Sequence, residues 1–245
     1  MGRPAHFPNG LSTVAGTKDL ALFKLPNPVD HIIFWDDFYD FDASAWVVTS
    51  VDTDGDGSEA NATASGAGGL LVLATEADEL DREELQWAGE ESSAVVEFFA
   101  PGDTKRFFMK TRFKVSDATD TAVIIGACVT DTTLAAVADG IYFRKADTST
   151  TLELVVEKNS TESTISMGAM ADDTFVVASM SFDAGASGKD TPQIKAYLND
   201  VHVGTITTAA NLPDDVTLAP SIAVNNGAEG SEDLTIDYLF IAQDR

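Results

Sequence analysis

Apolar residues in this chain come in short runs, and glycine, aspartate, asparagine and serine interrupt them from Trp46 to the C-terminal end. Several runs alternate apolar and polar side chains with a period of two, which is typical of strands with one buried face. Twelve runs are predicted as strands: 45–51, 69–75, 93–99, 106–115, 121–130, 140–146, 151–158, 174–182, 193–198, 201–207, 216–224 and 233–242.

The run at 106–115 shows the alternation most clearly. Its predicted buried face consists of Phe107, Met109, Thr111, Phe113 and Val115. Its opposite face consists of Arg106, Phe108, Lys110, Arg112 and Lys114. The same pattern opposes Leu152, Leu154 and Val156 to Glu153, Val155 and Glu157.

The connections are typical of hairpins. Asn199-Asp200 separates two runs as a two-residue turn of residues that tolerate positive φ, and residues 147–150 join another pair. Helical periodicity is scarce, and the acidic stretch at 76–87 is predicted as a loop with at most one helical turn. Many short strands at this spacing indicate an all-β sandwich or barrel.

The first thirty residues differ from the rest. They hold four of the eight prolines and are slightly basic, whereas the remainder of the chain is strongly acidic. Because proline restricts φ and lacks a donor, residues 1–30 are predicted as an extended arm and residues 31–245 as one domain. The arm also contains Leu11, Leu20 and Phe23, which need burial, either on its own domain or on a neighbouring subunit.

Composition excludes several classes of partner. The net charge is −25, from 15 basic and 40 acidic residues, which disfavours binding to nucleic acid and to anionic membranes. No stretch approaches the roughly 20 apolar residues that span a bilayer. The start of the chain does not resemble a secretory signal, and the single Cys128 forbids an internal disulfide.

The acidic stretch VDTDGDGSEA at 51–60 raises the question of calcium. Asp52, Asp54 and Asp56, followed by a glycine, match the start of an EF-hand loop. The twelfth position requires a bidentate acid but is Thr63, so the match fails where the geometry is most demanding. An acidic turn between two strands is favoured, and weak calcium binding stays as the alternative.

No other residue pattern predicts a catalytic, cofactor-binding or metal site. His6, His31 and His202 lack ligand spacing, and Cys128 is expected to be a small buried apolar residue. With Glu83 taken as the third acid, Glu76 and Asp78 do not match the spacing of sandwich glycanases, because Glu83 is too far along the chain. The protein is therefore expected not to be an enzyme.

Two further groups of side chains allow alternative interpretations. Trp35, Trp46 and Trp87 are expected in the core rather than at a sugar site. The row Lys110, Arg112 and Lys114 is expected either to pair with the chain's own acids, such as Glu153 and Glu157, or to face an acidic neighbour.

The segments QIKAYLNDVHVGTI and LTIDYLFIAQDR resemble the concanavalin A-like or laminin G-like jelly roll, in which a strand, a tight turn and a short strand precede a long final strand. This resemblance covers residues 34 to 243. It implies an antiparallel jelly-roll β-sandwich.

The segments GRPAHFPNGLSTVA, DDFYDF, KTRFKVSDAT, VVEKNST, ADDTF and LNDVHVG are similar to virion structural proteins of marine tailed bacteriophages, some of which decorate the head. This second resemblance implies a non-enzymatic capsid decoration or cement protein, made in the host cytoplasm and placed on the capsid surface. Its expected partners are the major capsid protein and copies of itself, in a trimer. A lectin-like module that binds host glycans is the alternative.

Overall fold

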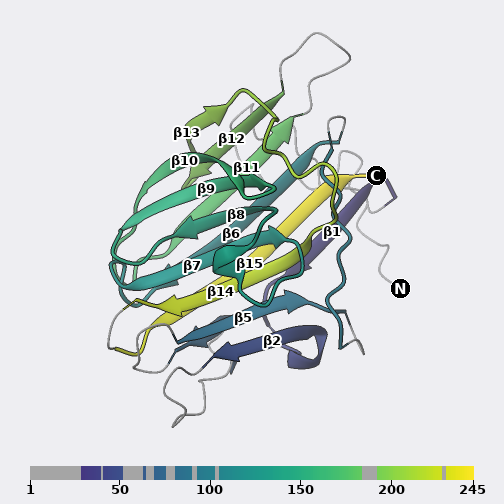
Figure 1. Ribbon diagram of the computed structural model, residues 1–245. Helices are drawn as coiled ribbons and strands as arrows, with labels where there is room; N and C mark the ends of the chain where they lie inside the picture. Colours follow the sequence, from purple (N-terminus) through teal and green to yellow (C-terminus); the bar gives the residue numbers. More distant parts are fainter. Residues whose placement is uncertain are drawn as a thin grey trace, which may run out of the picture.

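The computed structural model describes residues 29–39, 41–51, 63–64, 69–75, 81–89, 93–102, 105–183, 192–227 and 230–245. These residues form two antiparallel sheets that pack face to face (Figure 1). Helical structure in the described residues is confined to two 3₁₀ turns, η1 (Ala43–Ala45) and η2 (Leu134–Ala136). The predicted all-β sandwich is confirmed.

The eight-stranded sheet has the order β13-β12-β11-β6-β15-β4-β3, and β1 pairs with the half of β15 that β4 leaves free. Its strands are β1 (His31–Asp36), β3 (Thr63–Ala64), β4 (Leu71–Ala74), β6 (Phe107–Val115), β11 (Val176–Asp183), β12 (Gln193–Leu198), β13 (Val201–Ile206) and β15 (Asp233–Asp244).

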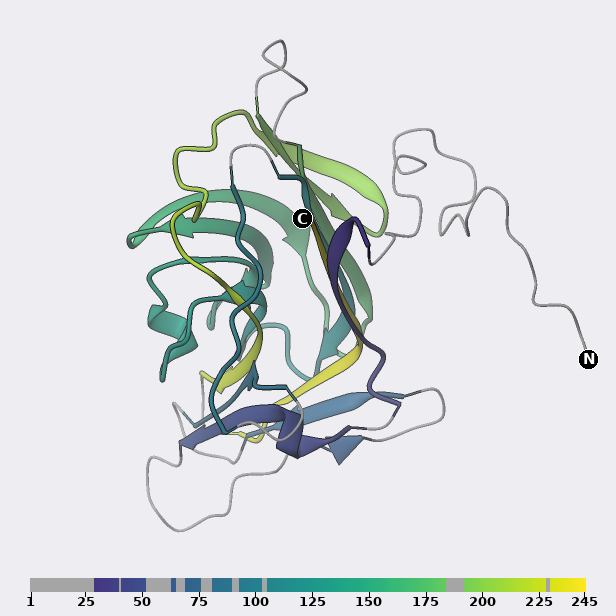
Figure 2. The same ribbon diagram turned by 90° about the vertical axis from the view of Figure 1, so that its right-hand side faces the viewer.

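The seven-stranded sheet has the order β10-β9-β8-β7-β14-β5-β2. Its strands are β2 (Trp46–Val51), β5 (Arg82–Trp87), β7 (Thr121–Cys128), β8 (Gly140–Lys145), β9 (Thr151–Lys158), β10 (Thr161–Ala169) and β14 (Ala219–Asn226). This sheet curves so that its outer face is concave, and the segment with η2 lies in the hollow (Figure 2).

The core fills the space between the two sheets. All five residues predicted for the buried face of β6 have no exposed surface. From the facing sheet, the inward side chains of β7, β8 and β9 join the same cluster, including Ile125, Phe143 and Leu154. Each such apolar side chain contributes about 1.5–3 kcal/mol on burial, so the alternating pattern accounts for how the sheets associate.

Eleven of the twelve predicted runs contain a strand in the structure. The prediction for 93–99 is wrong, because this segment crosses from one sheet to the other and forms only an isolated bridge between Phe99 and Leu218. Strands β1, β3 and β10 were not predicted. The outward positions of β10 are largely exposed, and its buried apolar side chains are only Ile165 and Met167, so its alternation is weak.

The loop predicted at 76–87 is also wrong over its second half, where β5 lies between β14 and β2. Both faces of β5 are buried, although the strand contains two consecutive acids, Glu83 and Glu84. Glu83 faces inward and accepts a hydrogen bond from Ser50, whereas Glu84 faces outward beneath the segment with η2. The tertiary partners of these carboxylates make a polar strand stable in a buried place.

The Asn199-Asp200 turn is confirmed, since both residues have positive φ, of 50° and 62°. Such a turn matches the twist of the strands that it joins. Several predictions lie outside the described residues: the arm up to residue 28, the acidic stretch at 52–62, and the pair Glu76 and Asp78. Among the described residues, no helix is long and apolar enough to cross a membrane.

Candidate functional site

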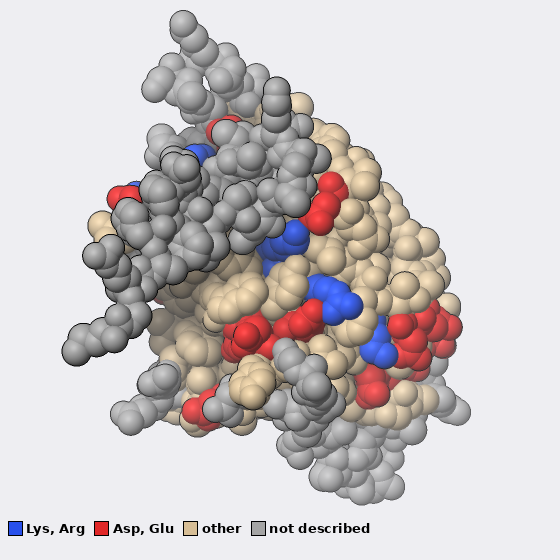
Figure 3. Space-filling model, turned by 180° about the vertical axis from the view of Figure 1, so that it is seen from behind, with Lys and Arg blue, Asp and Glu red and all other residues tan. Residues whose placement is uncertain are grey.

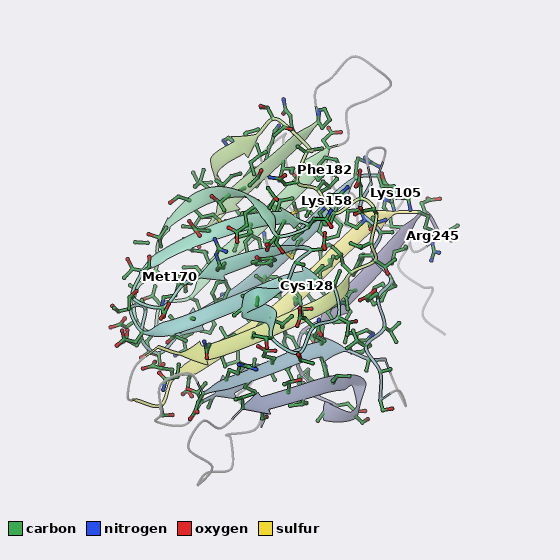
Figure 4. The ribbon with its side chains drawn as sticks, viewed as in Figure 1. Lys105, Cys128, Lys158, Met170, Phe182 and Arg245 are labelled. Atoms are coloured by element: carbon green, nitrogen blue, oxygen red, sulfur yellow. The ribbon has the colours of Figure 1, made fainter. Side chains whose placement is uncertain are left out.

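Residues 129–139 cross the concave face of the seven-stranded sheet. A second, smaller apolar cluster joins this crossing segment to the sheet and comprises Ile124, Cys128, Leu134, Val137, Tyr142, Val155 and Ala223. Figure 4 shows Cys128 on β7, beside the segment. The middle of the concave face is thus filled by the protein's own chain rather than open.

The outward side chains of β5 anchor the crossing segment. Gln86 donates to the carbonyl of Val129 at 2.9 Å and accepts from the amide of Asp131 at 3.0 Å. Glu84 Oε1 accepts from the amide of Leu134 at 3.1 Å, and Arg82 donates to the Thr133 hydroxyl at 3.2 Å. The three alternate positions of one strand therefore fix the path of the segment.

Beside the segment, the concave face holds a pocket of about 210 Å³. Strand register places its lining in two rows across four strands. One row runs Arg82, Asn225, Ala122 and the other Glu84, Ala223, Ile124, Arg144. Ala135 of η2 closes one side. Apolar side chains thus form the middle of the pocket, with polar groups at its ends.

Two oxygens of the lining residues are buried without a hydrogen-bond partner among the described residues, Glu84 Oε2 and Asn225 Oδ1. Arg82 Nε lies 3.3 Å from the other oxygen of Glu84, whose side chain is only 3% exposed. Burial raises the pKa of Glu84 more than the Leu134 amide and Arg82 lower it. A buried acceptor without a donor costs about 1–3 kcal/mol, so the pocket suits a ligand that brings donors.

Several other polar groups of the concave face are paired with one another. Arg144 bridges Glu153 at 3.1 Å and Glu162 at 2.5 Å, across β8, β9 and β10. The Tyr142 hydroxyl donates to Glu157 at 2.6 Å. This half of the concave face therefore carries closed ion pairs and presents little free charge.

The basic row lies on the outer face of the eight-stranded sheet, seen from behind in Figure 3, where basic and acidic side chains lie side by side. Each of its cations pairs with an aspartate of a neighbouring strand or turn: Lys110 with Asp200 at 2.7 Å, Arg112 with Asp237 at 2.5 Å and Lys114 with Asp173 at 2.5 Å. Pairing with the chain's own acids is confirmed. The suggested partners Glu153 and Glu157 were wrong, because they lie on the other sheet.

The three tryptophans divide between core and surface. Trp46 is 5% exposed and Trp87 packs against the core, as predicted. The prediction for Trp35 is wrong, because it is 56% exposed on the edge strand β1. Its ring lies on the outer face of the eight-stranded sheet, away from the concave face.

The other candidates from the sequence that the structure describes are one cysteine and two histidines. Cys128 is fully buried, and burial raises the pKa of its thiol far above the ordinary range. His31 lies 3.3 Å from Asp244, and His202 is an exposed residue of β13. No group of three His, Cys, Asp or Glu side chains in the described part of the chain could hold a metal ion.

Sequence reasoning missed Arg82, Glu84 and Asn225. Glu84 lies in a stretch whose sequence predicts a loop, and Asn225 follows the last apolar residue of its run, where asparagine usually marks a turn. Their convergence depends on β5 and β14 being neighbours, which nothing local in the sequence indicates.

No family model and no curated protein matches this sequence. Solved structures do resemble it. The carbohydrate recognition domain of Emp47p superimposes with a TM-score of 0.54 and 13% identity, over 88% of this chain and 98% of that one. Peanut lectin, solved with a nine-residue peptide, gives 0.54 and 11%, over 87% and 97%.

Botulinum neurotoxin type C, whose structure concerns its interaction with two ganglioside molecules, gives a TM-score of 0.53 at 10% identity. This chain spans only 47% of that chain, and a similarly small share, 43%, of a botulinum neurotoxin binding domain solved with rat synaptotagmin II. These likenesses show the fold, a lectin-like jelly roll of the concanavalin A-like type, as predicted.

Proposed function

We propose that this domain is a non-catalytic glycan-binding module and that its concave-face pocket holds one sugar residue. The observation that carries the proposal is the pair of buried, unpartnered oxygens on Glu84 and Asn225, at the β5 end of an apolar pocket floor. The proposal is the lectin-like alternative from the sequence. Carbohydrate recognition domains among the proteins of like fold support it.

The chemistry of the pocket matches a sugar ring. A pyranose has apolar CH groups on its faces and hydroxyls around its rim. The CH groups can pack on Ala122, Ile124 and Ala223, while hydroxyls can donate to Asn225 and Glu84 after a side-chain rotation uncovers their buried oxygens. The volume lies below the roughly 300–1,000 Å³ of pockets for drug-sized ligands, which suits a single ring with the rest of the glycan outside.

Binding is favoured over hydrolysis by the placing of the carboxylates. Glycosidases hold two carboxyl groups about 5–9.5 Å apart on either side of the bond that they cleave. The pocket's second acid, Asp147, lies beside Gly227, four residues along the chain from Ala223, the register partner of Glu84. At about 3.3 Å per strand residue, the two acids are about 13 Å apart along the strand direction.

The test is calorimetry of the full chain against neutral oligosaccharides, after a glycan array has identified a bound sugar. Asn225→Leu removes one acceptor at similar volume and is expected to weaken binding at least tenfold, because about 1.4 kcal/mol corresponds to one factor of ten. Glu84→Gln replaces the unpartnered acceptor by a donor. It should weaken binding less, because a sugar hydroxyl can also accept a hydrogen bond.

The matched control is Gln193→Leu, the same kind of change on β12 of the other sheet. Equal affinity in Asn225→Leu, Gln193→Leu and the unmodified chain would show that the pocket is not the binding site. Hydrolysis of the bound oligosaccharide, lost in Glu84→Gln, would instead show that the protein is an enzyme.

Capsid decoration, virion location and self-association stay predictions from the sequence resemblance. The arm proposed as the anchor lies outside the described residues, and the similar structures named above are described in terms other than a virion. A glycan-binding domain displayed on a particle would satisfy both interpretations. Immunogold labelling of particles made in an infected host would test the location.

A further inference from the structure

Four aromatic side chains gather on the outer face of the eight-stranded sheet, opposite the face that packs in the core. They are Trp35 on β1, Tyr238 and Phe240 on β15, and Phe108 on β6, which we call the aromatic strip. Strand register explains the gathering. Trp35 is directly opposite Phe240, and Ala242 of β15 is directly opposite Phe108.

The indole of Trp35 is held in place although it is exposed. Its ring stacks on Tyr238 with centroids 5.5 Å apart and planes at 27°, and meets Phe240 edge-on at 5.8 Å. Phe240 in turn contacts Phe108, which is only 7% exposed. Since Tyr238 covers one face of the indole, its 56% exposed surface lies on the opposite face and edge.

A large aromatic ring in a fixed orientation suits recognition of a flat apolar surface. Ordering a free side chain normally costs conformational entropy on binding. The contacts with Tyr238 and Phe240 order Trp35 in advance, so this cost is largely avoided.

Hydrogen-bonding groups surround the strip. Arg112 is opposite Tyr238 in the strand register and pairs with Asp237, and Lys110 is opposite Phe240 and pairs with Asp200. Each pair is neutral overall, yet each offers both a donor and an acceptor. These closed pairs, together with the net charge of −25, disfavour a strongly charged partner.

We propose that the aromatic strip is a second glycan-binding surface, on which the indole of Trp35 stacks against the CH face of a neutral pyranose. The Arg112–Asp237 pair lies on the Tyr238 side of the indole, so only a neighbouring sugar of the same glycan, lying over β15, would reach it with its hydroxyls. The ligand class rests on the proposed function, whereas the location rests on the strip itself.

The two surfaces lie on opposite outer faces of the sandwich. Packed sheets are about 10 Å apart before outer side chains are added, so one sugar ring cannot contact both. A domain with both surfaces can bind two glycan chains at once. Such bivalent binding raises avidity for a surface that displays many copies of the glycan.

The test uses the full chain with cellohexaose, mannohexaose and chitin hexamer as probes. Trp35→Ala is expected to weaken binding of at least one probe about tenfold and to abolish the change in tryptophan fluorescence on binding. Tyr39→Ala is the matched control, because Tyr39 is 76% exposed but makes no ring contact with the strip in the described structure. It should bind as the unmodified chain does.

Comparison with Asn225→Leu separates the two proposals. Binding lost in Trp35→Ala but kept in Asn225→Leu would support the strip and overturn the pocket. Binding kept in Trp35→Ala but lost in Asn225→Leu would overturn the proposal for the strip and support the proposal for the pocket. Binding unchanged in both variants, or no binding of any probe, would overturn the strip.

Two further results would identify a different occupant of the strip. Acrylamide quenching that is the same in Trp35→Phe and the unmodified chain would mean that the indole is already covered. A dimer in sedimentation that Trp35→Ala converts to monomer would assign the strip to a second copy of the chain. Either result would overturn the proposal.

Discussion

At the scale of single residues, the same residue type has opposite roles in different places. Trp46 and Trp35 both stand in apolar surroundings in the sequence, yet one is in the core and the other is on the surface. Strand alternation places each ring on a face, but which face is buried depends on the second sheet. Only the tertiary structure therefore distinguishes a core aromatic from an exposed one.

The pKa of Lys145 likewise depends on where the tertiary structure places its side chain. Its side chain is fully buried, and its ammonium donates to the carbonyls of Thr119 and Thr121. Burial lowers the pKa of Lys145 to about 8, although several nearby carboxylates act in the opposite direction. In an unfolded chain a lysine titrates near 10.4.

This shift predicts a pH dependence of stability. Between about pH 8 and 10 the unfolded chain binds the proton that the folded chain has released, so the free energy of unfolding rises with pH, by at most about 1.4 kcal/mol per unit. The measurement is urea unfolding at about pH 7, 8 and 9.5, for the unmodified chain and Lys145→Met.

Subtracting the variant removes the contribution of groups that the two proteins share. The free energy of unfolding of the unmodified chain minus that of Lys145→Met should rise with pH over this range. A difference that does not change with pH would contradict the lowered pKa of Lys145.

At the scale of elements, β5 is the most informative. Its sequence, REELQW, has the composition of a solvent-exposed turn, yet it is buried on both faces. Local pattern could not predict it, because its stability depends on Ser50, on β14 and on the segment at 129–139. By contrast, the pattern alone predicted β6, whose inward residues are apolar or, for Thr111, small.

Gln86 is predicted to be the main anchor of the crossing segment. Gln86→Ala removes its hydrogen bonds to Val129 and Asp131 and leaves half-buried backbone groups unpaired, at a cost of at most about 1–3 kcal/mol. Hydrogen exchange of the Asp131 and Leu134 amides should speed up more than that of β6 amides, which report on global unfolding.

Gln193→Ala, on the other sheet, is the control and should leave exchange in the segment unchanged. Uniform acceleration throughout the protein in Gln86→Ala would mean that the segment opens only with the whole domain, and that Gln86 is not a local anchor.

At the scale of the whole molecule, the excess of acids dominates the surface. Ion pairs engage most of the basic groups of the described sheets, including the basic row and Arg144. With only 15 basic residues against 40 acids, most carboxylates have no cation to pair with. Repulsion among them should destabilise the folded chain where it is not screened.

The melting temperature is therefore predicted to rise by several degrees between about 0.02 M and 1 M NaCl, as the Debye length falls from about 20 Å to about 3 Å. Differential scanning calorimetry at fixed pH measures it, and KCl should act equally if screening is the cause. Extra stabilisation by calcium at matched ionic strength would indicate a cation site, with Asp52, Asp54 and Asp56 the first candidates. A melting temperature independent of salt would contradict the repulsion.

The sequence by itself determined the class of fold, most of the strands and the tight turn at Asn199-Asp200, because alternation and turn chemistry act over a few neighbouring residues. Only the tertiary structure decided which strands are neighbours, and hence that Arg82, Glu84 and Asn225 line one pocket and that Trp35 stacks on Tyr238. Both sites join residues from strands far apart in the chain, and cross-strand pairing leaves no local periodic signal by which to predict them.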